Sequence, residues 1–364
     1  MKQWLETRQV FERLAALHAS GLRAALATVV RVNGSAYRHE GAKLIVAEDE
    51  SSVGNVSGGC LEADVREVAQ RVLRSGVAEL RTYCGGAEEI AAWDLGVGCD
   101  GEVEILIEPV SSPRLHERNA LQSELGYVAV TRLRESRECG EASRLLISDA
   151  GAFGSLSDPA LDAHARAHAA EWRLLGVSRI EMVGDERLLL DVLQPPPRLV
   201  IVSAGDDARI LARLSAEVGF RVVVVDRRPG LLAPERFPET VTLLESDATR
   251  LTELLVLDDS ACCVVMTHDF ADDANYLRAL LQTQATYIGM LGPRQRTERI
   301  LTRLRADGPL DTARIYGPVG LDIGTDGAEQ VALAVLAEIL AVRSGRQPQS
   351  LRDRRAPIHA NAAE

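Results

Sequence analysis

LVIVSAGDDARILARLSAEVGFRVVVVD, residues 199–226, is the stretch of this 364-residue chain that decides its fold. It begins with a short apolar run, passes through a glycine-containing turn and continues as a helical pattern with its apolar residues on one face. Gly219 stops that pattern, and a β-branched run follows and ends at Asp226. A strand, a helix and a second strand in this order predict two parallel strands joined by a crossover helix.

The same alternation continues toward the end of the chain. Three prolines, Pro195 to Pro197, precede the first strand and indicate a linker, because proline disfavours helix at its own position and at the one before. We therefore predict a Rossmann-like, doubly wound parallel sheet for residues 198–343. Further strands are expected at 241–244, 261–266, 287–290 and around 315, and further helices at 272–281, 295–304 and 327–342.

The part before the linker, residues 1–194, predicts a separate α+β domain, and its pattern leaves the topology open. Residues 344–364 are rich in Arg, Pro, Gln and Ala, and we expect a mobile tail there. No repeat of fixed period is visible. Strands are expected at 24–32, 43–47, 79–83, 102–108, 127–133, 144–147 and 188–192, and helices at 1–20, 62–73 and 159–174.

Charge and composition exclude several classes of protein. The net charge is −12, which argues against a nucleic-acid partner, because such proteins usually present a dominant basic surface. No apolar run approaches the roughly 20 residues that span a membrane. The six cysteines show no CxxC spacing, so most are expected to be reduced thiols. We expect a cytoplasmic protein.

The turn after the first strand of 198–343 partly matches the dinucleotide fingerprint G-x-G-x-x-G/A. Gly205 occupies the place of the second glycine, but Ser203 stands where the first glycine belongs. Asp226 ends the next strand, where a carboxylate binds ribose hydroxyls. Asp206 and Asp207 place negative charge where a phosphate would bind, and they could equally cap the helix. NAD(P) is therefore an alternative cofactor.

Several segments taken together resemble the XdhC/CoxI family of accessory proteins of xanthine dehydrogenase and carbon monoxide dehydrogenase. The resemblance covers residues 20–110 and 198–342. It implies a protein that binds molybdenum cofactor, protects it while its sulfur ligand is installed and passes it to an apo-hydroxylase. The segments are GSAYR (34–38), GAK (41–43), SGGCLE (57–62), GVGCDG (96–101), IEP (107–109), VMTHD (265–269), YIGMLGPR (287–294) and GPVGLDIG (317–324).

The resemblance also implies partners and a departure from the family. The expected partners are an apo molybdenum hydroxylase of the xanthine dehydrogenase type, a cysteine desulfurase and a second copy of the chain as a homodimer. Family members commonly carry a Gly-Ala-Gly-His turn, whereas this chain has Ser203-Ala204-Gly205-Asp206. We expect a maturation factor rather than a self-contained catalyst. An NAD(P)-dependent oxidoreductase, a nucleotidyltransferase and a scaffold for the hydroxylase are the alternatives.

Two cysteines are candidate ligands of molybdenum through the cofactor. Cys60 follows Gly58 and Gly59 and precedes a helix, whose positive N-terminus favours the thiolate. A thiolate is a soft ligand that suits molybdenum, zinc or a persulfide sulfur. The alternative is a small buried residue in a tight turn. Cys99 lies between glycines in a second candidate binding loop. Cys262 and Cys263 lie in an apolar strand and are expected to be core thiols.

Four further residues are candidates for cofactor binding. His268 and Asp269 follow a parallel strand, at the sheet edge where ligands bind, although Asp269 could instead cap the next helix. Pro293 starts a helix, so Arg294 lies in its first turn, where an arginine is disfavoured unless an anion binds; the alternative is a solvated face. Asp322 lies between Gly320 and Gly324 and is either a ligand or a turn carboxylate.

Overall fold

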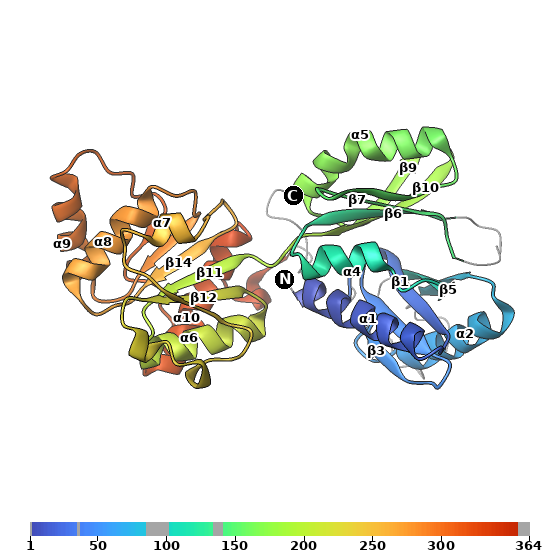
Figure 1. Ribbon diagram of the computed structural model, residues 1–364, viewed down its shortest axis with the longest axis horizontal. Helices are drawn as coiled ribbons and strands as arrows, with labels where there is room; N and C mark the ends of the chain where they lie inside the picture. Colours follow the sequence, from blue (N-terminus) through green and yellow to red (C-terminus); the bar gives the residue numbers. More distant parts are fainter. Residues whose placement is uncertain (1, 35–36, 85–101, 134–140, 356–364) are drawn as a thin grey trace. The chain divides into compact units, whose positions relative to one another are not determined.

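The computed structural model describes all residues except 1, 35–36, 85–101, 134–140 and 356–364 (Figure 1). The chain forms two compact units, Met1–Pro195 and Pro196–Glu364. Cys99 and Cys139 lie outside the described residues. No helix in the described ranges is long and apolar enough to cross a membrane.

The first half of unit 1 is a helix followed by an antiparallel sheet with a second helix inserted. The strand order in this sheet is β3-β2-β1-β5-β4. The two helices are α1 (Lys2–Ala19) and α2 (Glu62–Ser75). The strands are β1 (Ala24–Asn33), β2 (Lys43–Ala47), β3 (Ser52–Gly54), β4 (Glu79–Cys84) and β5 (Glu102–Val110).

The second half of unit 1 repeats this arrangement. Its antiparallel sheet has the order β8-β7-β6-β10-β9, which matches the first sheet strand for strand. Helix α4 (Leu115–Gln122) precedes the sheet as α1 does, and α5 (Pro159–Leu175) is inserted after the third strand as α2 is. The strands are β6 (Tyr127–Leu133), β7 (Arg144–Ser148), β8 (Gly151–Ser155), β9 (Arg179–Val183) and β10 (Glu186–Leu193). The structure thus contains a topological repeat that the sequence pattern did not indicate.

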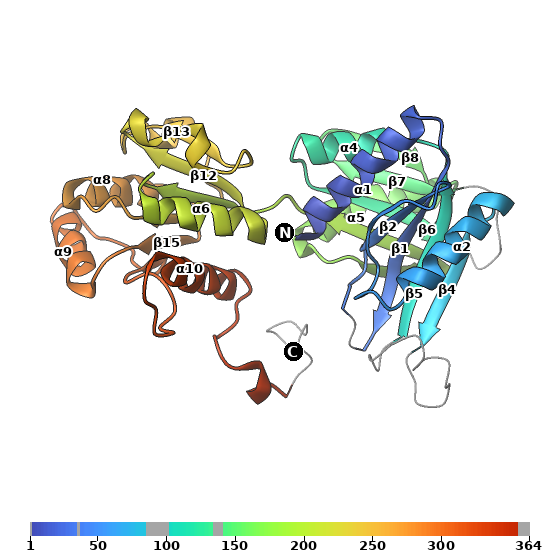
Figure 2. The ribbon, with the colours of Figure 1, turned by 90° about the horizontal axis from the view of Figure 1, so that it is seen from below.

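The core of unit 1 joins these two halves. Side chains of α1, α4 and both sheets form one continuous cluster, while α2 covers the other face of the first sheet and α5 that of the second (Figures 1 and 2). Lys43 of β2 and Asp191 of β10 also connect the halves, with 2.7 Å between Nζ and Oδ2 and both side chains at most 1% exposed. Burial lowers the pKa of Lys43.

Unit 2 is built on one parallel sheet. Its strand order, β13-β12-β11-β14-β15-β16, is the 3-2-1-4-5-6 order of a Rossmann fold. The predicted Rossmann-like sheet is therefore confirmed. The strands are β11 (Arg198–Val202), β12 (Arg221–Asp226), β13 (Thr242–Glu245), β14 (Cys262–Val265), β15 (Tyr287–Met290) and β16 (Ile315–Tyr316).

Helices cover both faces of this sheet, because its strands are apolar on both sides. Helices α6 and α10 cover one face, and α7, α8 and α9 cover the other (Figure 1). Cys262 and Cys263 are fully buried, as predicted for core thiols. The helices are α6 (Asp206–Val218), α7 (Leu251–Leu254), α8 (Phe270–Leu281), α9 (Arg294–Arg305) and α10 (Ala328–Arg343).

Candidate cofactor-binding site

The loop between β3 and α2 distinguishes the first half of unit 1 from the second. Residues 55–61 form it and include Ser57-Gly58-Gly59-Cys60, whereas only residues 156–158 link β8 to α5. In that short link the Asp158 side chain caps α5 by accepting bonds from the N–H groups of Ala160 and Leu161. Helix α2 has Leu61 at its N-cap and no side-chain cap. Of the two equivalent helices, α5 thus has a side-chain cap at its N-cap and α2 has none.

Ser57 and Glu62 hold the open loop in shape. The Ser57 hydroxyl donates a short hydrogen bond to Glu62, and its oxygen accepts from the N–H groups of Gly59 and Leu61 at 3.0 and 3.1 Å. The other Glu62 oxygen accepts from the N–H groups of Ser57 and Val56. Burial alone would raise the pKa of Glu62, but these hydrogen bonds outweigh it and hold that pKa below its usual range.

Cys60 is half-buried, and in the sequence it lies between Ser57 and Glu62, the two residues of this brace. Its side chain packs against the cluster between α2 and the first sheet. Helix N-terminal N–H groups and the positive end of a helix favour an anionic ligand, while the first-turn carboxylates of Glu62 and Asp64 oppose one. Gly59 has a φ of +115°, and a methyl group there would have no neighbour within 4 Å, so the loop leaves open space at the residue before Cys60.

The donor set here fits a metal that brings most of its own ligands. Among the described residues, no three His, Cys, Asp or Glu side chains gather as they would around a protein-held metal. A single thiol in an open loop suits a soft metal within a larger cofactor. Cys84 is exposed at the end of β4, while the prediction for Cys99 falls outside the described residues and stays a prediction. Sequence reasoning missed the Ser57–Glu62 brace, whose only signal is the serine five residues before the glutamate.

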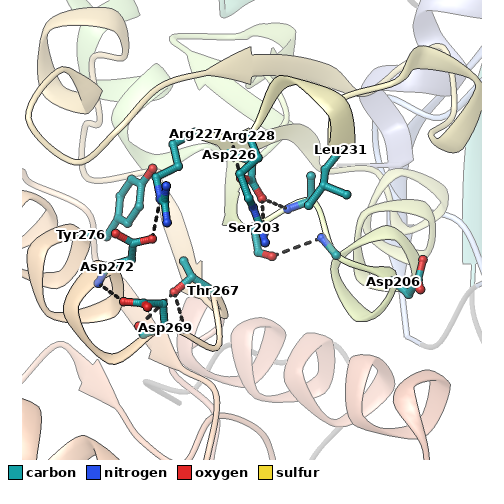
Figure 3. A network of polar contacts seen from close by, with 12 residues as sticks. Ser203, Asp206, Asp226, Arg227, Arg228, Leu231, Thr267, Asp269, Asp272 and Tyr276 are labelled. Carbon is teal, nitrogen blue, oxygen red and sulfur yellow. Dashed lines mark hydrogen bonds and ion pairs between the residues drawn. The ribbon is translucent and has the colours of Figure 1, made fainter.

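At the edge of unit 2, the turn after β11 is closed by its own side chains (Figure 3). Ser203 has a φ of +150°, a conformation that favours glycine. Its hydroxyl oxygen accepts from the Gly205 N–H at 3.2 Å, and Asp226 accepts from the Ala204 N–H at 2.8 Å. These two N–H groups lie in the turn that binds pyrophosphate in dinucleotide-binding proteins.

Both carboxylate oxygens of Asp226 accept hydrogen bonds from neighbouring residues. One accepts from the Arg228 N–H and Nε, and the other from Arg228 Nη2 as well as Ala204 (Figure 3). Burial would raise the pKa of Asp226, but the Arg228 guanidinium and the backbone N–H groups hold it below its usual range. The carboxylate stays charged and already has partners where a ribose would bind.

A cavity of about 150 Å³ lies beside this turn, and its lining polar groups pair with one another. Arg227 Nε lies 2.7 Å from Asp272, and the Tyr276 hydroxyl donates to the Ser246 carbonyl at 2.6 Å (Figure 3). Pockets for drug-sized ligands have volumes of about 300–1,000 Å³. The cavity is therefore small for a dinucleotide.

The other predicted site residues of unit 2 fall in different places. His268 is 67% exposed, and its Nε2 lies 3.7 Å from Asp207. The Asp269 side chain caps α8, accepting from two N–H groups, so the capping alternative is confirmed. Arg294 and Asp322 are exposed, and within the described part of the chain neither side chain forms a hydrogen bond or ion pair. The structure gathers Gly205, Asp226, His268 and Asp269 at one sheet edge; their role in cofactor binding stays a prediction.

Fold and site together define a two-unit protein in which an α+β unit with a loop thiol precedes a Rossmann-like unit. Comparison with known families gives the same division. Residues 17–84 match the XdhC and CoxI family, and residues 199–339 match the XdhC Rossmann domain. The chain belongs to the XdhC/CoxI family.

Three relatives match over most of their length. A Bacillus subtilis protein whose name describes it as a probable component of xanthine dehydrogenase is 29% identical over 88% of this chain and 93% of its own. The Escherichia coli molybdenum cofactor insertion chaperone PaoD is 25% identical over 91% of this chain and 87% of its own. A Bacillus halodurans crystal structure described as a xanthine dehydrogenase is 30% identical, with a TM-score of 0.75, over 94% of this chain and 98% of that one.

Proposed function

We propose that this protein is a maturation factor that binds molybdenum cofactor, supports its sulfuration and delivers it to an apo molybdenum hydroxylase of the xanthine dehydrogenase type. The observation that carries the proposal is the similarity to a molybdenum cofactor insertion chaperone along nearly the whole of both chains. The half-buried thiol of Cys60, in an open loop at an uncapped helix start, supports it with suitable chemistry.

Each part of the loop has a role in this proposal. Cys60 binds the molybdenum end of the cargo through sulfur, and the open first turn of α2 offers N–H groups to the anionic groups of the cofactor. The Ser57–Glu62 brace keeps the loop in one conformation, so that little entropy is lost on binding. The protein holds and passes on its cargo, and no further catalytic group is required of it.

The partners and the compartment belong to the same proposal. The client is the apo-hydroxylase, a cysteine desulfurase supplies the sulfur, and the chain acts as a homodimer. A free thiol at the site fits a reducing compartment, so the proposal places the protein in the cytoplasm. The closed turn of unit 2 weighs against the alternative of an NAD(P)-dependent oxidoreductase.

Deletion of the gene tests the maturation role. The hydroxylase polypeptide should remain present and folded but should contain little sulfurated, active cofactor. Hydroxylase activity and cofactor content are measured in the purified enzyme. Normal values for both in the deletion strain would refute the proposal.

Cysteine variants test the site. Cys60→Ala should lose molybdenum cofactor during gel filtration while melting at the wild-type temperature, because a half-buried thiol in an open loop contributes little to packing. Retention is followed by cofactor fluorescence. The exposed Cys84 provides the matched control, and Cys84→Ala should retain cofactor. Loss with Cys99→Ala but not with Cys60→Ala would move the ligand to Cys99, and retention by both variants would refute the thiol site.

A further inference from the structure

Tyr37 is exposed in a way that sets it apart from the other aromatic side chains. Among the Phe, Tyr and Trp residues of the described ranges it alone is exposed, at 68%. A single apolar residue on a surface is ordinary, so exposure alone assigns nothing. Whether the exposed ring has a function depends on what it lies against.

The ring lies against the loop that carries Cys60. A methyl group placed on Gly58 would be 3.4 Å from Tyr37 Cγ and 3.7 Å from its Cβ and Cδ1, which is van der Waals contact. Gly58 and Cys60 are two residues apart, so their Cα atoms are separated by at most about 7 Å. An exposed aromatic ring therefore lies against the thiol's loop, two residues before Cys60, although the ring and the thiol are more than 20 residues apart in sequence.

The segment that follows Tyr37 is fastened to the rest of the unit. Arg38 forms an ion pair with Glu6 of α1. Glu40 accepts a hydrogen bond from the Val32 N–H at 2.9 Å, and its carbonyl accepts from the Gln3 side chain at 3.1 Å. These contacts lie directly after the tyrosine and restrain its backbone. Neither Gly58 nor Gly59 has a side chain that could cover the ring.

We propose that Tyr37 is the stacking residue of the Cys60 site and binds the flat pterin ring of the cargo. The inference rests on the proposed function, because the ligand class comes from it. Aromatic rings stack in offset geometry on planar heterocycles, and the contact depends on the ring rather than on the hydroxyl. Cys60 then binds the metal end of the cofactor, and Tyr37 binds the pterin end. Two separate contacts orient the cargo with its molybdenum toward the thiol.

Binding of two ligands distinguishes the metal contact of Cys60 from the pterin contact of Tyr37. The ligands are molybdenum cofactor and metal-free molybdopterin, and the affinity of the full-length protein for each is measured by pterin fluorescence. Tyr37→Ala should weaken the binding of both by about 10- to 100-fold, the range found for aromatic stacking on a heterocycle. Tyr37→Phe should bind both as the wild type does. Cys60→Ala should weaken only the molybdenum form. Leu174→Ala, which removes a side chain 87% exposed on α5, is the control for loss of exposed apolar surface.

A thermal melt of each variant distinguishes stacking from a structural role. If Tyr37→Ala melts lower yet binds metal-free molybdopterin as the wild type does, the residue only covers the loop and the stacking proposal is wrong. If Tyr37→Ala loses both ligands while Cys60→Ala keeps both, stacking stands and the thiol site fails. If the wild-type protein binds neither ligand, the proposed function and the stacking role both fall.

Discussion

Asp226 accepts a hydrogen bond from the backbone N–H of Ala204 at 2.8 Å, so the carboxylate expected to bind a ribose is bound to the turn instead. The neighbouring N–H of Gly205 is bound by Ser203. A Rossmann-like sheet is therefore present while two polar groups of its nucleotide turn are paired internally. The fold alone does not confer the ligand.

We expect NAD to bind weakly, with a Kd on the order of tens of micromolar at best. Ser203→Gly should tighten binding by about 2- to 10-fold, because it frees one N–H donor worth about 0.5–1.5 kcal/mol and relieves the positive φ. Calorimetry with NAD, NADP and ATP measures both proteins. A submicromolar affinity for NAD that disappears in Asp226→Ala would favour the oxidoreductase alternative.

The Glu62 brace should make unit 1 sensitive to acid. The pKa of the Glu62 carboxyl is lowered in the folded protein from the ordinary 4.5. The folded state therefore binds fewer protons at Glu62 than the unfolded state does. The stabilisation is therefore complete above pH 4.5 and is lost as the pH falls through the lowered pKa. Glu62→Gln should cost about 1–3 kcal/mol at neutral pH, the value of hydrogen bonds to a charged group.

Urea unfolding at several pH values measures this effect. The difference between wild type and Glu62→Gln should shrink on going from neutral pH to about pH 3.5. Glu67, exposed on the same helix, provides the control, and Glu67→Gln should change stability by less than about 0.5 kcal/mol. An equal loss from Glu62→Gln at all pH values would show that the charge of Glu62 is not involved.

The two glycines before Cys60 should respond differently to alanine. Gly59→Ala places a side chain at a φ of +115°, which should cost about 1–2 kcal/mol and shift the loop. Gly58 is outside the positive-φ region, and its new methyl group would only touch Tyr37. The melting temperature and the rate of Cys60 alkylation are measured for both variants. Equal effects of the two substitutions would contradict the backbone argument.

The ion pair between Lys43 and Asp191 should matter for stability far more than a surface pair. Replacing Asp191 removes the carboxylate that pairs with the buried Lys43 ammonium and should cost about 3–5 kcal/mol. Replacing Lys43 should cost less, because Asp191 keeps Arg144, whose Nη2 lies 3.6 Å from its Oδ2. Lys43→Met with Asp191→Leu should recover most of that loss, because both charges leave the core. The exposed pair Arg8–Glu12, at 2.9 Å, is the control and should contribute less than about 1 kcal/mol. Urea unfolding of the single and double variants gives a double-mutant cycle. Additive losses in the free energy of unfolding would show that the two charges are not coupled.

Sequence reasoning located most strands and helices, because each has a local signal. The bounds predicted for β2, β6, β12 and β15 agree with the structure. It missed β3, β8, β9 and the short helices α4 and α7. Strand β8 is GAFGS and mostly exposed, so neither alternation nor β-branched residues mark it. It becomes a strand because the adjacent β7 supplies its hydrogen bonds.

The candidate site was predictable in part. The position of Cys60 before a helix was visible, because glycines and an apolar helical face are local features. Its brace was not, since nothing in the sequence shows that Glu62 turns inward to Ser57. The contact of Tyr37 with Gly58 was also out of reach, because it joins two loops through the folding of the sheet.

The sequence by itself determined the parallel sheet of unit 2, the helix after Cys60 and the family. These follow from the spacing of apolar residues, glycines and prolines, which act over a few neighbouring residues. Only the tertiary structure decided that unit 1 is a topological repeat, that Asp226 closes the nucleotide turn and that Tyr37 lies against Gly58 in the loop of the thiol. Each of these depends on residues far apart in the chain meeting in space, and side-chain pairing of that kind leaves no local pattern.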